Sequence, residues 1–292
     1  MTDIRPLGEH ACLLGESPLW HPLEACFYCV DIPGREILRW HACQSEPDRW
    51  AQDAEPSCVA AHADGGLLVT RRDGLFRFID GALTRLAPPP YDPTRQRFND
   101  GKVGPDGRLW VGSLSDAREP EAVLYVWTGQ RFEARVGGLH VSNGLAWSPD
   151  GRRQYWSDTK LHRIYTADFD PATGASGVPR VFAEFPPKMA GHPYGGRPDG
   201  AAVDADGAYW SALFEGGALV RLSPTGEVLQ RVALPVTCAT MPTFGGDDLR
   251  TLYITTAREK RPADELAREP WAGRVLTFRV DVPGLPANLV RA

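Results

Sequence analysis

The stretch NDGKVGPDGRLWVGSL (Asn99–Leu114) and the stretch NGLAWSPDGRRQYWSD (Asn143–Asp158) follow one pattern. Each begins with an asparagine, reaches an Asp-Gly turn seven residues later, and continues into aromatic and β-branched residues. DGAAVDADG (Asp199–Gly207) repeats the spacing with an aspartate in first place. ESPLWHPLEACFYCVD (Glu16–Asp31) runs parallel to the second stretch, with its glutamate in the same position. The chain therefore contains internal repeats that place an oxygen-bearing side chain at one equivalent position.

The turns of these repeats recur at a regular interval along 292 residues. Asp-Gly-type turns at 64, 106, 150, 206 and 248 are 42, 44, 56 and 42 residues apart. A period of about 40–45 residues with four short strands in each unit is typical of a β-propeller blade. Six units therefore predict an all-β, six-bladed β-propeller that forms a single domain over residues 1–292. A two-sheet sandwich would need no such period.

Four segments lie outside the regular repeat. Residues 185–200, including the loop 188–197, form an insertion before Asp199 that we interpret as a rim or lid loop, with a plain surface excursion as the alternative. Residues 257–273 are rich in Ala, Glu and Leu and allow a short helix. His10–Leu14 and the tail after Asp281 are expected to complete one blade together, which would remove a free sheet edge.

Composition excludes several classes of protein. The net charge is −5 and no basic stripe is present, which argues against nucleic acid as a partner. No apolar run suits a signal peptide or a membrane span, so we expect a cytoplasmic protein without a membrane partner. The pair Cys26 and Cys29 has C-x-x-C spacing, but residues three apart on a strand point to opposite faces. We therefore expect buried, reduced thiols.

The repeat position predicts a ring of side chains around a central channel. The six positions are occupied by Glu16, Ser57, Asn99, Asn143, Asp199 and Met241. Four carry carboxylate or amide oxygens, the ligands that hard divalent cations prefer. Asx residues before glycine also form ordinary turns, but that alternative does not explain Glu16. Arg97 precedes Asn99 by two residues and would share its face of the strand, where it suits recognition of hydroxyl or carboxylate groups.

Together these motifs resemble the senescence marker protein/gluconolactonase/luciferin-regenerating-enzyme family, which includes regucalcin and bacterial sugar lactonases. The resemblance implies a divalent metal held by Glu16, Asn143 and Asp199, with Asp199 also the catalytic base. It places Arg97 and Asn99 in contact with the substrate. Glu121, or alternatively Glu119, would supply a further substrate-binding carboxylate before the strand at residues 123–127. The motifs that carry the resemblance are LGESPLW (14–20), RFNDGKVGPDGRLWVGSL (97–114), SNGLAWSPDGRRQYWSDT (142–159), RPDGAAVDADGAYWSAL (197–213) and FGGDDLRTLYITTAR (244–258).

The expected activity is metal-dependent hydrolysis of a carboxylic ester, the ring ester of an aldonolactone such as gluconolactone, xylonolactone or arabinonolactone. Ca²⁺ is the favoured cation, with Zn²⁺, Mn²⁺ and Fe²⁺ as alternatives. Activation of the water by the metal is the alternative to Asp199 as base. Two other functions remain open: hydrolysis of aryl esters or organophosphates on the same propeller, and non-catalytic calcium binding. The partner is then a small sugar lactone, and the protein is a monomer or a small homo-oligomer.

Overall fold

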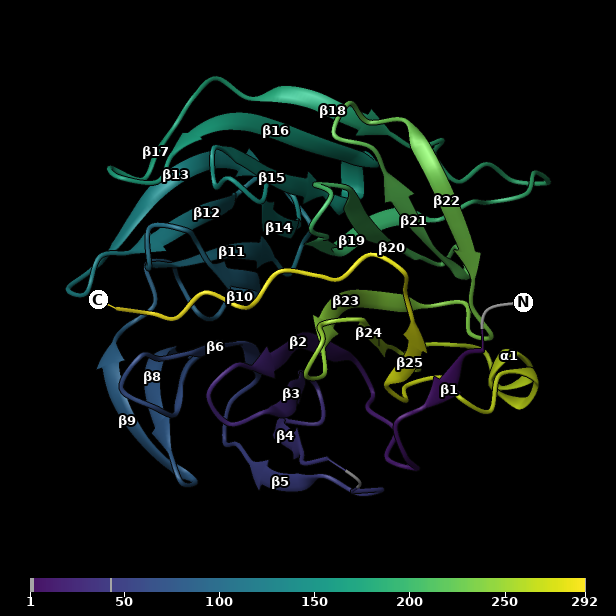
Figure 1. The fold of residues 1–292 in the computed structure, drawn as a ribbon, viewed down its shortest axis with the longest axis horizontal. Helices are drawn as coiled ribbons and strands as arrows, with labels where there is room; N and C mark the ends of the chain where they lie inside the picture. Colours follow the sequence, from purple (N-terminus) through teal and green to yellow (C-terminus); the bar gives the residue numbers. More distant parts are fainter. Residues whose placement is uncertain (1–2, 43, 292) are drawn as a thin grey trace.

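Six antiparallel sheets surround a central channel in the computed structural model, which describes residues 3–42 and 44–291 (Figure 1). Each sheet is one blade of a β-propeller, so the predicted fold class is confirmed. In order from the channel outward, the strands of the first three blades are β2 (Gly15–His21), β3 (Cys26–Asp31), β4 (Glu36–Trp40) and β5 (Asp48–Ala51); β6 (Pro56–Ala61), β7 (Leu67–Arg71), β8 (Gly74–Ile79) and β9 (Ala82–Ala87); and β10 (Gln96–Val103), β11 (Leu109–Ser115), β12 (Ala122–Trp127) and β13 (Phe132–Leu139).

The other three blades contain the irregular segments of the chain. Their strands are β14 (Ser142–Trp147), β15 (Arg153–Asp158), β16 (Arg163–Asp170), β17 (Ala175–Ser176) and β18 (Arg180–Glu184); β19 (Arg197–Val203), β20 (Tyr209–Phe214), β21 (Ala218–Leu222) and β22 (Val228–Ala233); and β23 (Ala239–Gly245), β24 (Thr251–Thr256), β25 (Leu276–Arg279) and β1 (Arg5–Pro6). Both β17 and β18 pair with β16. The short helix expected between residues 257 and 273 is α1 (Ala263–Arg268).

Alternating side chains hold neighbouring blades together. In β15, Tyr155 packs into an apolar cluster shared with the fifth blade, where Tyr209 lies. The next residue, Trp156, packs on the opposite face against Trp110 of the third blade. Successive strand residues point to opposite faces, so one run of aromatic residues fills the space on both sides of a blade. The core therefore lies between the blades, and the channel is left to the polar residues of the inner strands.

The last blade is closed by the N-terminal strand, which differs from the sequence-based expectation. Arg5 and Pro6 of β1 pair with Thr277 and Leu276 of β25, whereas residues 10–14 do not join that blade as a strand. The tail after Asp281 instead crosses the channel at one end (Figure 1). Its backbone is held by hydrogen bonds to three blades: Ala205 N to Pro283 O at 2.8 Å, Val290 N to Ala61 O at 2.9 Å and Arg291 N to Gly107 O at 3.0 Å. The channel is thereby covered where the inner strands end.

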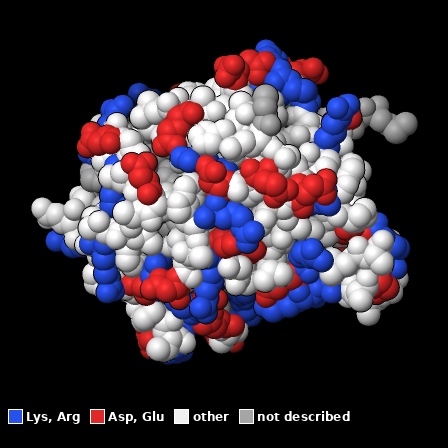
Figure 2. Space-filling model, turned by 90° about the horizontal axis from the view of Figure 1, so that it is seen from below, with Lys and Arg blue, Asp and Glu red and all other residues white. Residues whose placement is uncertain are grey.

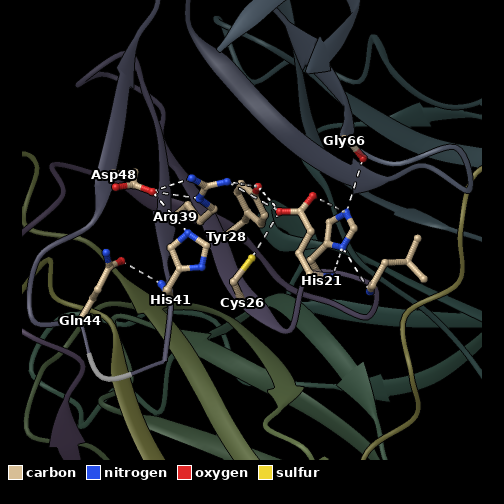
Figure 3. Close-up of polar contacts among 10 residues, drawn as sticks. His21, Cys26, Tyr28, Arg39, His41, Gln44, Asp48 and Gly66 are labelled. Carbon is tan, nitrogen blue, oxygen red and sulfur yellow. Dashed lines mark hydrogen bonds and ion pairs between the residues drawn. The ribbon is translucent and has the colours of Figure 1, made fainter. Parts of the chain in front are cut away.

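The C-x-x-C pair lies in the first blade, with its two thiols on opposite faces as expected. Cys26 approaches a polar network (Figure 3), in which its Sγ lies 3.6 Å from Glu24 Oε2 and the Tyr28 hydroxyl donates to the same oxygen at 2.7 Å. Cys29 instead joins the apolar cluster that contains Cys12. Burial raises the pKa of the Cys26 thiol to about 12. Five described cysteines are buried and free, and Cys43 lies outside the described residues.

Charged side chains of both signs are interspersed on the side of the molecule shown in Figure 2. Many charged side chains of the protein form ion pairs within or between blades, such as Arg72 with Asp116 at 3.0 Å. Among the residues that the structure describes, no helix is long and apolar enough to cross a membrane.

Candidate active site

A cavity of about 360 Å³ lies where the inner strands begin, at the end of the channel opposite to the C-terminal tail. Five residues identified from the sequence line it: Glu16, Arg97, Asn99, Asn143 and Asp199. The remaining lining residues are Leu14, Leu114, Arg118, Val141, Thr159, Lys160, His162, Arg197 and Phe214. The repeat position therefore does converge on one concave site of a size that suits a small ligand.

Interruptions of the strand pairing aim the site residues into the channel. Each inner strand loses regular register at this position, and the shifts fall between Glu16 and Leu19, Phe98 and Gly101, Asn143 and Ala146, and Pro198 and Ala201. A β-bulge redirects side chains and is common beside active sites. In β14 the bulge contains Gly144 at φ +63°, where an added Cβ would collide with the Tyr209 hydroxyl.

The other two ring positions have a structural role. Ser57 Oγ lies 3.2 Å from Thr70 Oγ1 and is buried between β6 and β7. In the sixth blade the register shift falls at Thr240, whose hydroxyl donates to Thr255 Oγ1 at 2.8 Å. Met241 lies one residue further on and lines the cavity at the opposite end of the channel. The oxygen-bearing site is therefore built by four of the six blades.

A chain of hydrogen bonds connects the arginine to the aspartate across three blades. Arg97 Nη1 donates to Asn99 Oδ1 at 2.8 Å, and Asn99 Nδ2 donates to Asn143 Oδ1 at 2.8 Å. Asn143 Nδ2 in turn donates to Asp199 Oδ1 and, at 2.8 Å, to Thr159 Oγ1. All four members of the chain are buried, with 3–8% of their surface exposed. The guanidinium therefore fixes the orientation of two amides, and the second amide fixes the carboxylate.

The two carboxylates of the site lack a full set of partners. Glu16 is 7% exposed, and its Oε2 is buried without a hydrogen-bond partner among the described residues. Burial, followed by the negative charge of Asp199, raises the pKa of Glu16 well above its ordinary value. Burial likewise raises the pKa of Asp199 to about 7, although Arg197 opposes this rise. Two desolvated carboxylates in one cavity favour either protonation or a bound cation.

Asp100 adds a third buried carboxylate beside the channel. Its Oδ2 accepts a hydrogen bond from Leu145 N at 2.9 Å, which links the third and fourth blades. Its Oδ1 has no partner among the described residues, and burial raises its pKa to about 6. The positive charge of Lys102 opposes the rise in the pKa of Asp100. The Lys102 ammonium donates a hydrogen bond to Ala201 O of the fifth blade at 2.7 Å. Asp100 and Lys102 therefore tie the inner strand of the third blade to those of the fourth and fifth blades.

The donor set suits a hard divalent cation. Within residues 3–42 and 44–291, no three His, Cys, Asp or Glu side chains form a cluster that could hold a metal, so an amide oxygen has to complete the set. Glu16 and Asp199 supply two negative charges, and the unpartnered Glu16 Oε2 is free to bind. Asn143 directs its nitrogen toward Asp199, so its amide group has to turn over before its oxygen can serve as a ligand. Oxygen ligands of this mixture fit Ca²⁺.

Glu121 lies outside this cavity. Its carboxylate is exposed and forms an ion pair with Arg95 at 2.8 Å. Glu119 is also exposed and does not line the cavity. The substrate-binding role of Glu121 stays a prediction.

Three cations of the cavity were not identified from the sequence. Arg118 follows the end of β11, and Lys160 belongs to a short 3₁₀ helix (Thr159–Leu161) after β15. Because the second strand of a blade runs antiparallel to the first, its C-terminal end lies at the mouth where the inner strands begin. Arg197 begins the inner strand β19. Residues that directly follow the second strand of a repeat are therefore the signal that identifies Arg118 and Lys160.

The inserted loop before β19 is attached beside the cavity. Lys188 and Arg197 both pair with Glu215, at 3.1 and 2.6 Å. The Tyr194 hydroxyl lies 3.1 Å from Nε2 of His162, which lines the cavity. These contacts place the insertion at the rim of the site.

The chain is similar to known proteins over most of its length. The model of the SMP-30/Gluconolactonase/LRE-like region matches residues 14–258. A Pseudomonas putida protein named 6-deoxy-6-sulfogluconolactonase is 41% identical over 276 residues, which cover 93% of each chain. Regucalcin of Gallus gallus is 32% identical, covering 98% of this chain and 97% of its own.

A solved structure shows the same fold over the whole chain. It is described as a calcium-binding protein, regucalcin, from Agrobacterium tumefaciens, and superposes with a TM-score of 0.92 at 28% identity. The match covers 100% of this chain and 98% of the other. With its propeller, its channel residues and the family match over most of its length, the chain belongs to the SMP-30/gluconolactonase/LRE-like family.

Proposed function

We propose that the protein hydrolyses the ring ester of a sugar lactone to the open-chain acid, with an aldonolactone such as gluconolactone, xylonolactone or arabinonolactone as the substrate. The observation that carries this proposal is the pair of buried, incompletely partnered carboxylates, Glu16 and Asp199, at the end of the Arg97–Asn99–Asn143 chain. Membership of a family whose description includes gluconolactonase, and the name of the Pseudomonas putida relative, support a sugar lactone as the substrate class.

The proposal includes one divalent cation held by Glu16, Asn143 and Asp199. Ca²⁺ is favoured because every ligand is a hard oxygen, with Mn²⁺, Fe²⁺ and Zn²⁺ as alternatives. When bound, such a cation polarises a carbonyl and stabilises the negative charge that develops on its oxygen.

Asp199 is the proposed base. Asn143 would give up its hydrogen bond to Asp199 when its amide turns over to serve the cation. One carboxylate oxygen of Asp199 would then serve the cation, and the other would accept a proton from the attacking water. The water oxygen forms a bond to the lactone carbonyl carbon, and the bond from that carbon to the ring oxygen breaks. The proton taken by Asp199 passes to the ring oxygen, which becomes the new hydroxyl group. At neutral pH the released acid ionises, so each turnover delivers one proton to the solution.

Arg97 is the residue proposed to orient the substrate, and Asn99 supports it. Arg97 uses Nη1 for its contacts with Phe98 O and Asn99 Oδ1, both at 2.8 Å, so the other side of the guanidinium can bind a substrate oxygen. Asn99 has both amide atoms engaged, by Arg97 at one end and by Asn143 and Ser142 O at the other. Asn99 therefore acts chiefly by holding Arg97 and Asn143 in place.

Proton release in a pH-stat tests the proposal. The substrates are a panel of pentono- and hexonolactones, with an aryl ester and an organophosphate alongside, each with and without a chelator. Glu16→Gln and Asp199→Asn are compared with Asp150→Asn, which removes a carboxylate from an exposed turn at the other end of the channel. We expect metal-dependent lactone hydrolysis that both site variants lose and the control retains.

Two outcomes would contradict the proposal. Turnover of the aryl ester or organophosphate with no lactone turnover would assign a different substrate to the same site. Binding of a cation with no turnover of any substrate would indicate a calcium-binding protein without catalysis.

A further inference from the structure

Cationic side chains gather at the mouth of the cavity. Arg118, Lys160 and Arg197 line it together with the deeper Arg97, whereas Glu16 and Asp199 are its carboxylates. Cations therefore outnumber carboxylates in this lining, although the whole chain has a net charge of −5. Arg118 and Lys160 are exposed, and the two carboxylates are 6–7% exposed. The carboxylates thus lie at the base of the cavity and the positive charge at its entrance.

Two of these cations have no carboxylate partner in the part of the chain that the structure describes. Arg197 pairs with Glu215 at 2.6 Å, but Arg118 and Lys160 take part in no ion pair among the described residues. Most other arginines of the protein do pair, such as Arg72 with Asp116. Lys160 Nζ donates to the backbone oxygen of Arg118 at 2.6 Å, which ties the two turns together, and both residues line the same cavity.

The turn that carries Arg118 is conformationally unusual. Arg118 has φ +59°, in the left-handed region that non-glycine residues seldom occupy. Its guanidinium is half-enclosed, and burial lowers its pKa, with Asp116 and Asp199 opposing that effect. A guanidinium and an ammonium group that line one cavity, neither of them in an ion pair among the described residues, are a ready site for an anion with several acceptor oxygens.

The cavity is therefore negatively charged at its base and positively charged at its entrance, and this difference favours one orientation of a charged ligand. At the base, the amides and carboxylates suit the reacting ester and a cation, and at the entrance the free cations suit an anion. A cavity of about 360 Å³ accommodates one small molecule that reaches both regions. A neutral sugar lactone would leave the two free cations without a partner.

We propose that the substrate lactone carries a strong anion, a sulfonate or a phosphate, on the carbon farthest from the reacting carbonyl, and that Arg118 and Lys160 bind this anion. This inference rests on the proposed lactone hydrolysis, since it names the class of lactone that the same site accepts. Arg118 and Lys160 are then determinants of specificity and take no part in the bond-breaking steps.

The test compares gluconolactones that differ only at carbon 6, which carries a hydroxyl, a sulfonate or a phosphate. Kinetics are measured on the cation-loaded wild type, Arg118→Gln, Lys160→Gln and the double variant. Arg152→Gln is the matched control, because it removes one exposed positive charge beside the turn at the opposite end of the channel. The sulfonate and phosphate arms distinguish the two possible anions.

We expect the wild type to prefer an anionic lactone. Each single variant should lose about 10- to 100-fold in kcat/KM on that lactone, the range expected for one charge-assisted hydrogen bond. Turnover of the neutral lactone should change less than about threefold, and the control should behave as wild type. Higher salt should raise KM for the anionic lactone only, because salt screens exposed charges.

Other results would overturn the inference. An equal loss on neutral and anionic lactones would mean that the two cations only balance the charge of Asp199. A wild-type preference for the neutral lactone would remove the need for an anion site.

A binding measurement separates this inference from the proposed function. Calorimetry measures the affinity of the protein for the open-chain gluconic acids that carry a sulfonate or a phosphate on carbon 6. This measurement needs no catalysis. Binding that Arg118→Gln and Lys160→Gln weaken, without turnover of any lactone, would retain the anion site and reject lactone hydrolysis. Lactone turnover without binding of either anionic acid would reject the anion site and retain the lactonase.

Discussion

Replacing Asp199 with asparagine should stabilise the metal-free protein while abolishing its activity. Asp199 is 6% exposed, and burial raises its pKa from 3.8 to about 7. A carboxylate with a raised pKa stabilises the fold while it is protonated, at a pH below its unfolded pKa. That contribution is lost as the pH rises through the folded pKa of about 7. Asparagine has nearly the same shape, keeps an oxygen to accept the Asn143 hydrogen bond and never ionises.

The expected magnitude follows from that rise in pKa. Each tenfold change in proton affinity corresponds to about 1.4 kcal/mol, so ionising Asp199 costs the folded, metal-free protein about 4 kcal/mol at pH 8.5. The same relation gives about 2 kcal/mol at pH 5, where the folded state still holds the proton. Asp199→Asn should therefore raise the free energy of unfolding more at pH 8.5 than at pH 5.

Urea unfolding of chelator-treated protein at both pH values measures this effect, and kcat/KM is measured on cation-loaded samples. Asp204→Asn is the contrasting variant, because Asp204 is also buried but accepts hydrogen bonds from Trp210 and Arg221 at 2.9 and 2.8 Å. Replacing the Asp204 carboxylate should lower the free energy of unfolding at both pH values by about 1.5–3 kcal/mol. A gain for Asp199→Asn that is independent of pH, or a loss at pH 8.5, would mean that ionisation of Asp199 does not destabilise the metal-free fold.

Four further outcomes are expected. Ca²⁺ should raise the Tm of the wild type but not of Glu16→Gln or Asp199→Asn in thermal-shift measurements, and an equal rise in all three would place the cation elsewhere. Asn143→Ala should lower kcat/KM at least about 30-fold while far-UV circular dichroism stays unchanged, since a buried hydrogen-bond connection is lost. Arg97→Lys should raise KM for the lactone about tenfold with a smaller change in kcat, because lysine lacks the planar fork; a change in kcat alone would contradict a binding role. Gly144→Ala should lower the free energy of unfolding by at least about 1 kcal/mol in urea titrations, because its φ of +63° disfavours any Cβ; unchanged stability would mean that the bulge adapts.

Much of the base of the site was predictable because it follows the repeat. Glu16, Asn99, Asn143 and Asp199 occupy equivalent places in inner strands, and repeated local structure brings equivalent positions around one axis. The sixth blade shows where this reasoning loses accuracy. There the bulge falls at Thr240, one residue before the predicted Met241. A shift of one residue turns a side chain to the other face of the strand, so Met241 does not join the site.

The rim of the site depends on contacts between segments far apart in the chain. Glu121 lies in a turn near the expected place, but its carboxylate pairs with Arg95, 26 residues earlier. Arg118 lies in the same turn, lines the cavity and is joined to Lys160 of the next blade. No periodic pattern distinguishes these two turn residues, since loop conformation is set by the neighbouring blade.

The all-β propeller, its six blades and four polar residues of the channel are predictable from the sequence. They depend on turns and on alternating strand patterns, which are local in the chain and repeat at a constant interval. The structure was needed to show that β1 closes the last blade, that the C-terminal tail covers one end of the channel, and that cations without an ion pair among the described residues line the other. Those features arise from pairing and packing between distant segments, whose free energies depend on the assembled fold and leave no period in the sequence.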